Sequence, residues 1–131
     1  MIMSIMNAAA VRHGRKFCCV ESMDNPVLMI RFCPCKGRQV LLPWSRFEYA
    51  NFLPGEDSQR IELVFAHHKV TAIGYGLEPL EKEISQMRIR CLRDLPESHF
   101  LTFEPEEPFI KRLEIGLVDG AKNPFQGNMP F

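Results

Sequence analysis

Residues 60–93 constrain the fold more than any other part of the chain. Their first part, residues 60–66, has the two-residue period of a half-buried strand. The side chains expected on its buried face are Ile61, Leu63 and Phe65. A second apolar run, residues 70–73, follows two histidines and a lysine, so the sequence predicts a hairpin with its tip at residues 67–69. Gly74 is expected to break the second strand, because glycine can adopt the backbone angles of a sharp exit.

A short helix and a third strand are expected in the rest of this stretch. Apolar residues recur there at spacings of three and four, which places them on one helical face. These residues are Leu77, Leu80, Ile84 and Met87. The helix is expected to pack on the buried face of the hairpin. Residues 87–91 then return to a period of two, which predicts a strand. Ile89 and Cys91 are expected on one face of it, and arginines on the other.

A second hairpin and a second helix are predicted earlier in the chain. Residues 27–33 are expected to form one strand, and residues 38–42 its partner. The side chains expected on the core face of the first of these strands are Leu28, Ile30 and Phe32. Ser45 and Glu48 have the spacing of a capping box, in which each side chain bonds the backbone N–H of the other residue. A helix over residues 46–52 is therefore expected.

The two ends of the chain carry weaker patterns. Residues 17–20 are expected to form a first strand, and residues 99–103 a short edge strand. Residues 109–118 fit two patterns. Phe109, Leu113 and Leu117 have helical spacing, whereas Leu113, Ile115 and Leu117 have strand spacing. We favour the strand.

These elements together predict an α+β fold with a mostly antiparallel sheet of five to seven strands. Two short helices are expected to pack on one face of the sheet, in two hairpin-then-helix units. The chain has 131 residues, which predicts a single domain; we place it over residues 1–118, with a loosely ordered lead-in at residues 1–14. Residues 119–131 are expected to form a C-terminal arm.

The net charge and the cysteine content limit the classes of function that the chain can have. Sixteen basic and sixteen acidic residues give a formal net charge of zero, which argues against a nucleic-acid binder and favours self-association. The five cysteines are odd in number and two are adjacent, which does not suit a disulfide framework. No run of about 20 apolar residues is present, so no membrane span is expected. We therefore expect a cytoplasmic protein.

Arginines provide the first candidate site. Arg88 and Arg90 alternate along the strand expected at residues 87–91, and Arg93 follows closely. Such a row of guanidinium groups can hold a phosphate or the carboxylates of a partner. The alternative is an outward sheet face whose arginines pair with acidic side chains such as Glu62.

Cysteines and histidines provide the second candidate site. Cys33 and Cys35 are separated by one residue, whereas metal sites usually separate two cysteines by two residues. His67 and His68 are adjacent, so on a strand their side chains would point to opposite faces. We interpret the cysteines as small apolar residues, with a zinc site as the alternative. No catalytic residue, metal ion or cofactor is expected.

The predicted function is that of a non-enzymatic protein-interaction or scaffold domain that associates with itself or with another protein. Its contact surface is expected in the apolar C-terminal segment, residues 109–131, which includes Phe125 and Phe131. Two alternatives remain open. One is a protein that binds a small molecule, nucleotide or phosphate through the arginine row. The other is a small metal-binding protein that uses cysteine and histidine.

Overall fold

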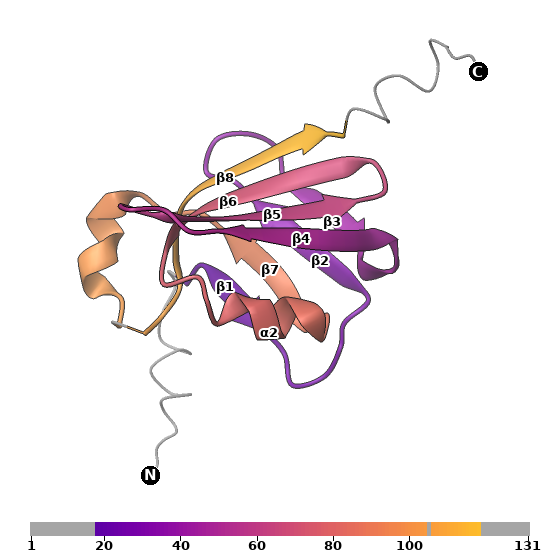
Figure 1. The fold of residues 1–131 in the computed structure, drawn as a ribbon, viewed down its shortest axis with the longest axis horizontal. Helices are drawn as coiled ribbons and strands as arrows, with labels where there is room; N and C mark the ends of the chain where they lie inside the picture. The colour runs from indigo at the N-terminus through magenta and orange to yellow at the C-terminus, as the bar shows by residue number, and fades with distance from the viewer. Residues whose placement is uncertain (1–17, 105, 119–131) are drawn as a thin grey trace.

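The computed structural model describes residues 18–104 and 106–118. Within them the chain forms eight strands in two four-stranded sheets (Figure 1). The first sheet, in spatial order, consists of β1 (Val20–Ser22), β7 (Ile89–Arg93), β2 (Met29–Cys33) and β3 (Val40–Pro43). The second sheet, in spatial order, consists of β4 (Phe47–Leu53), β5 (Gln59–Phe65), β6 (His68–Tyr75) and β8 (Phe109–Leu117). The helical segments are η2 (Trp44–Arg46), α2 (Leu80–Ser85) and η3 (Glu97–Thr102).

Strand pairing is antiparallel with one exception. β7 lies between β1 and β2, and it runs antiparallel to β1 but parallel to β2. The second sheet follows chain order except that β8 joins at the free side of β6. No helix in the described part of the chain is both long enough and apolar enough to cross a bilayer.

A single core lies between the two sheets. The second sheet lies in front of β2, β3 and β7 in Figure 1, and α2 lies along the lower side of the molecule. Phe32 of β2 and Phe65 of β5 pack edge to face, with ring centroids 6.0 Å apart. Leu63 of β5 and Ile84 of α2 are buried in the same apolar cluster. Trp44 is also buried, and its indole N–H donates a hydrogen bond to the Ile89 carbonyl at 3.0 Å.

The α+β class and the mostly antiparallel pairing are confirmed, but the sheet count is not. The strands number eight among the described residues, and they form two sheets rather than one sheet of five to seven strands. The prediction over residues 60–93 is the most accurate. The hairpin β5–β6, the helix α2 and the strand β7 follow in the expected order, with Leu77, Leu80 and Ile84 buried. Met87 differs: its φ is 54°, and 40% of it is exposed after the helix has ended.

The helix expected over residues 46–52 is wrong. Arg46 ends the 3-10 turn η2, whose N-terminus has no side-chain cap, and residues 47–53 form β4. β4 contains three aromatic side chains, which suit a pleated surface, and it pairs with β5 along most of its length. Only the second of the two expected hairpin-then-helix units therefore exists. Leu28 was expected in the core, but β2 begins at Met29, two residues after the expected start, and Leu28 is 86% exposed.

The strand expected at residues 109–118 is confirmed as β8, which pairs with β6 and buries Phe109, Ile110 and Leu113. The strand expected at residues 99–103 is wrong, because residues 97–102 form the 3-10 helix η3. The first strand, β1, begins at Val20 rather than at residue 17. The expected lead-in at residues 1–14 and the arm at residues 119–131 lie outside the described residues.

Candidate functional site

The outward face of the first sheet carries a row of side chains from four strands. Glu21 of β1 and Arg31 of β2 both pair with Cys91 of β7, and Arg31 also pairs with Leu41 of β3. Residues directly opposite one another on neighbouring strands project to the same face. The row therefore runs Glu21, Cys91, Arg31, Leu41. Cys33 and Arg93, which pair directly, lie one step further along the same face.

A β-bulge in β7 brings a second arginine to this row. Ser22 pairs with Ile89 and Glu21 with Cys91, so Arg90 is an extra residue with no partner on β1. The bulge also interrupts the alternation along β7. Ile89 enters the core cluster while Cys91 faces outward, which corrects the expectation that the two share a face. Leu92 returns to the core.

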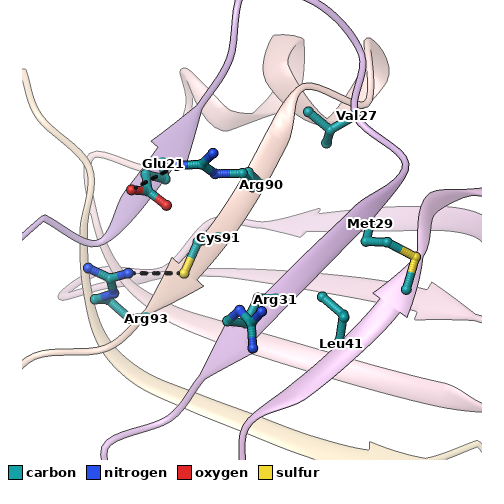
Figure 2. Close-up of a pocket in the computed structure, with 8 residues that line it drawn as sticks. All are labelled: Glu21, Val27, Met29, Arg31, Leu41, Arg90, Cys91 and Arg93. Carbon is teal, nitrogen blue, oxygen red and sulfur yellow. Dashed lines mark hydrogen bonds and ion pairs between the residues drawn. The ribbon is translucent and has the colours of Figure 1, made fainter.

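The row forms the floor of a groove of about 530 Å³ (Figure 2). Its charged lining consists of Arg31, Arg90, Arg93 and Glu21, and its remaining lining consists of Val27, Met29, Leu41 and Cys91. Three guanidinium groups and one carboxylate leave the lining with two positive charges in excess. The groove therefore combines a cationic side with an apolar side.

The three groove arginines differ in their partners. Arg90 forms an ion pair with Glu21, with 3.4 Å between Nη2 and Oε2. Arg93 donates a hydrogen bond from Nη2 to the Cys91 sulfur at 3.1 Å. Burial lowers the pKa of Arg93, but the hydrogen bond and the interaction with Cys91 outweigh burial and raise it. Arg31 is exposed and has no carboxylate partner among residues 18–104 and 106–118.

Arg88 belongs to a different part of the molecule. Its Nη2 lies 3.0 Å from the Glu83 carboxylate of α2, and its Nε is buried with no hydrogen-bond partner in the described part of the chain. Ser22 also donates a hydrogen bond to Glu83. The Ser22 bond lowers the pKa of Glu83, burial opposes this, and Arg88 lowers it further. Arg88 thus ties α2 to the start of β7 and does not line the groove.

Of the predicted arginine row, the structure brings Arg90 and Arg93 together and replaces Arg88 with Arg31. The sequence pattern placed Arg31 outward on its strand, since Ile30 and Phe32 were expected in the core. It carried no signal that β2 would pair with β7. The two predicted aromatic contacts, Phe125 and Phe131, lie outside the described residues.

Cys33 and Cys35, which are close in the sequence, have different surroundings in the structure. Cys33 ends β2 and its sulfur lies 3.7 Å from the sulfur of Cys91. Cys35 is exposed in the following turn, where its backbone N–H donates to the Asp94 carboxylate. His67 lies in the β5–β6 turn, and His68 begins β6. No group of three or more metal-binding side chains occurs in the described part of the chain.

Cys19 has a structural role. Its thiol donates to the Ile110 carbonyl at 3.7 Å, and its sulfur accepts a hydrogen bond from the Ile110 N–H at 3.2 Å. Burial raises the pKa of the Cys19 thiol to about 12, against the opposing hydrogen bond from Ile110. The thiol therefore stays protonated near neutral pH and joins the start of the first sheet to β8.

Comparisons with protein-family models, with curated protein sequences and with solved structures return no match for this chain.

Proposed function

We propose that the chain is a binding protein for an organic anion, a phosphate or carboxylate compound, which it holds in the groove on the first sheet. The observation that carries the proposal is the convergence of Arg31, Arg90 and Arg93 on one groove that contains a single carboxylate, Glu21. Guanidinium groups present several N–H donors in a planar fork, which matches the oxygens of phosphate and carboxylate groups.

The lining also supports an organic rather than an inorganic ligand. Val27, Met29 and Leu41 form an apolar side next to the arginines. Ligand sites usually combine apolar walls with a few placed polar groups that fix orientation. Arginine keeps its charge at all ordinary pH values, so these residues suit holding an anion rather than transferring a proton. The role we propose is therefore binding without catalysis.

Arg31→Ala should weaken binding of a phosphate monoester such as phenyl phosphate by about tenfold or more, because a hydrogen bond to a charged group contributes about 1.5–3 kcal/mol. Arg31 is exposed and has no carboxylate partner in the described chain, so its removal leaves no buried charge behind. Isothermal titration calorimetry at low salt measures the affinity. Inorganic phosphate serves as the second probe, and it should bind more weakly because it lacks the apolar part.

The matched control is Arg46→Ala. Arg46 is exposed in η2 and does not line the groove, so this variant removes the same charge from another place. Its affinity should equal that of the unchanged chain. An equal loss of affinity in both variants would mean that overall charge, and not the groove, determines binding. The proposal is refuted if the unchanged chain shows no detectable binding at millimolar ligand.

We propose self-association as a second function, and the position of β8 supports it. β8 is an edge strand of the second sheet and pairs only with β6 in the part of the chain that the structure describes. The free edge of β8 is covered at Ile110, whose backbone bonds Cys19 and Leu95, and at Leu113, whose N–H donates to Asp94. Another strand can therefore add beyond Leu113, where residues 114–117 pair with β6 alone in the described chain. A second copy pairing at β8 would give the homodimer that the apolar C-terminal segment predicts.

Light scattering at roughly 50 micromolar should then give a dimer mass, and Leu117→Lys should give a monomer, because charge on an edge strand opposes pairing. Leu117 is 57% exposed at the end of β8, so the substitution leaves the core intact. The control is Leu101→Lys in η3, where the leucine is 90% exposed, and this variant should stay dimeric. A monomer mass for the unchanged chain, or a dimer for both variants, contradicts this second proposal.

We also propose a cytoplasmic location. The support is chemical: all five cysteines are free thiols, and secreted domains of this size usually oxidise their cysteines.

A further inference from the structure

We propose that Cys91, which lines the groove, and Cys33, whose sulfur lies beside it, are a thiol–disulfide pair that a hydroperoxide oxidises. The two sulfurs lie 3.7 Å apart although the residues are 58 positions apart in the sequence. They come from neighbouring strands, β2 and β7, and their side chains lie on the same outward face of the sheet. A disulfide has an S–S length of about 2.05 Å, so closure needs the sulfurs to approach by less than about 2 Å.

The two thiols have different environments. Arg93 donates its hydrogen bond to the Cys91 sulfur, so a guanidinium group lies beside the sulfur on which negative charge develops during attack. The pKa of the Cys33 thiol is raised, because burial and the neighbouring Cys91 sulfur outweigh Arg93 and Arg31, which lower it. The arrangement assigns attack on the peroxide to Cys91 and the second step to Cys33. Cys91 is only 4% exposed, but it lines the groove, which a small peroxide can enter.

The chemistry balances with hydrogen peroxide as the oxidant. In the first step the Cys91 thiolate attacks one peroxide oxygen, an S–O bond forms, the O–O bond breaks, and the departing hydroxide takes up a proton as water. In the second step Cys33 loses its proton and attacks the sulfenic sulfur of Cys91, so that the S–S bond forms and the S–O bond breaks. The oxygen leaves as a second water. Two thiols lose two electrons in total, and one peroxide becomes two waters.

Two of the other three cysteines, Cys19 and Cys35, differ from Cys33 and Cys91. Cys19 is buried, bonded to Ile110 and held as a thiol. Cys35 is exposed in the turn after β2, and its backbone N–H donates to the Asp94 carboxylate. Exposure alone would favour reaction at Cys35, whereas the geometry favours Cys33 and Cys91. The two explanations therefore predict different products.

The experiment treats the full chain with one equivalent of hydrogen peroxide at neutral pH, alkylates the remaining thiols with N-ethylmaleimide and maps the peptides by mass spectrometry. The expected main product is a chain lighter by two hydrogens, with a Cys33–Cys91 cross-link that dithiothreitol reverses. Protection of Cys19 from alkylation marks the chains that are folded during the reaction. A main cross-link between other cysteines, or chains with Cys19 protected and no cross-link, overturns the proposal.

Two variants test the assigned roles. Cys33→Ser should stop the reaction at a sulfenic acid on Cys91, which dimedone labels. Cys35→Ser is the matched control and should form the cross-link to the same extent as the unchanged chain. Dimedone labelling mainly at Cys35 in the first variant contradicts the assignment. The proposal does not depend on anion binding, because its readout is a cross-linked peptide and not an affinity.

Discussion

Replacing Gly74 with alanine should destabilise the fold by more than about 4 kcal/mol, which is a rare size for one methyl group. Gly74 lies within β6, opposite β8, where the register of the pair shifts. A Cβ at this position would lie 1.8 Å from the Phe109 carbonyl oxygen and 2.9 Å from the Ile110 Cα. Both contacts are backbone atoms, so no side-chain rotation relieves them and the two strands must separate. Urea denaturation followed by circular dichroism measures the free energy of unfolding.

Gly116→Ala is the matched control, because it makes the same change in a paired strand. Gly116 is in β8, and a Cβ there would meet no heavy atom of the described residues within 4 Å. Alanine should be neutral or stabilise by about 0.5–1 kcal/mol, since it restricts the unfolded chain more than glycine does. Equal effects of the two substitutions would mean that the approach of β8 to Gly74 is not as close as described.

Leu63→Ala should lower the free energy of unfolding by about 2–5 kcal/mol. Leu63 is fully buried in the cluster that also contains Ile84 of α2. Removing its branched end takes away apolar contact between the sheet and the helix and leaves a cavity, and both effects destabilise. The measurement is again chemical denaturation.

Leu28→Ala is the matched control for Leu63→Ala, because the sequence pattern places both leucines in the core. In the structure Leu28 is 86% exposed, so its truncation should change the stability by less than about 0.5 kcal/mol. A loss of 2 kcal/mol or more at Leu28, by the same cavity argument, would place it in the core and contradict the start of β2.

The fold was predictable where local patterns and tertiary packing agree. In β5, Ile61, Leu63 and Phe65 occupy alternate positions and are all buried as expected, and Val64 is buried as well. The spacing of Leu80 and Ile84 similarly identifies the buried face of α2. In α2 one face is buried and the other is largely exposed, and in β5 the expected face is the more deeply buried, so the sequence period carries the information.

Predictions failed where pairing with a distant strand overrides the local pattern. Ser45 and Glu48 have capping-box spacing, yet residues 47–53 become a strand because β5 supplies a partner for their backbone. Gly74 was expected to end its strand, whereas it continues the strand and leaves room for β8. Neither partner strand is visible in a short window of sequence.

The candidate site shows the same division. Arg90 and Arg93 were predicted from their closeness in the sequence, and both line the groove. Arg31 and the Cys33–Cys91 contact depend on the parallel pairing of β2 with β7, which joins segments far apart in the chain. The bulge at Arg90 places Ile89 and Cys91 on opposite faces of the sheet, and a simple two-residue period cannot anticipate an inserted residue.

The position of β7 between β1 and β2 also orders the events of folding. β1 and β2 make no pair with each other. β2 pairs with its neighbour in sequence, β3, but only β7 joins it to β1, and β7 follows both by more than half of the described chain. The hairpin β5–β6 can close at once, because its strands are adjacent in sequence. Contacts between distant segments form slowly, since a long loop must close before they contribute. During synthesis, therefore, the first sheet and its arginine groove cannot assemble until Arg93 has emerged.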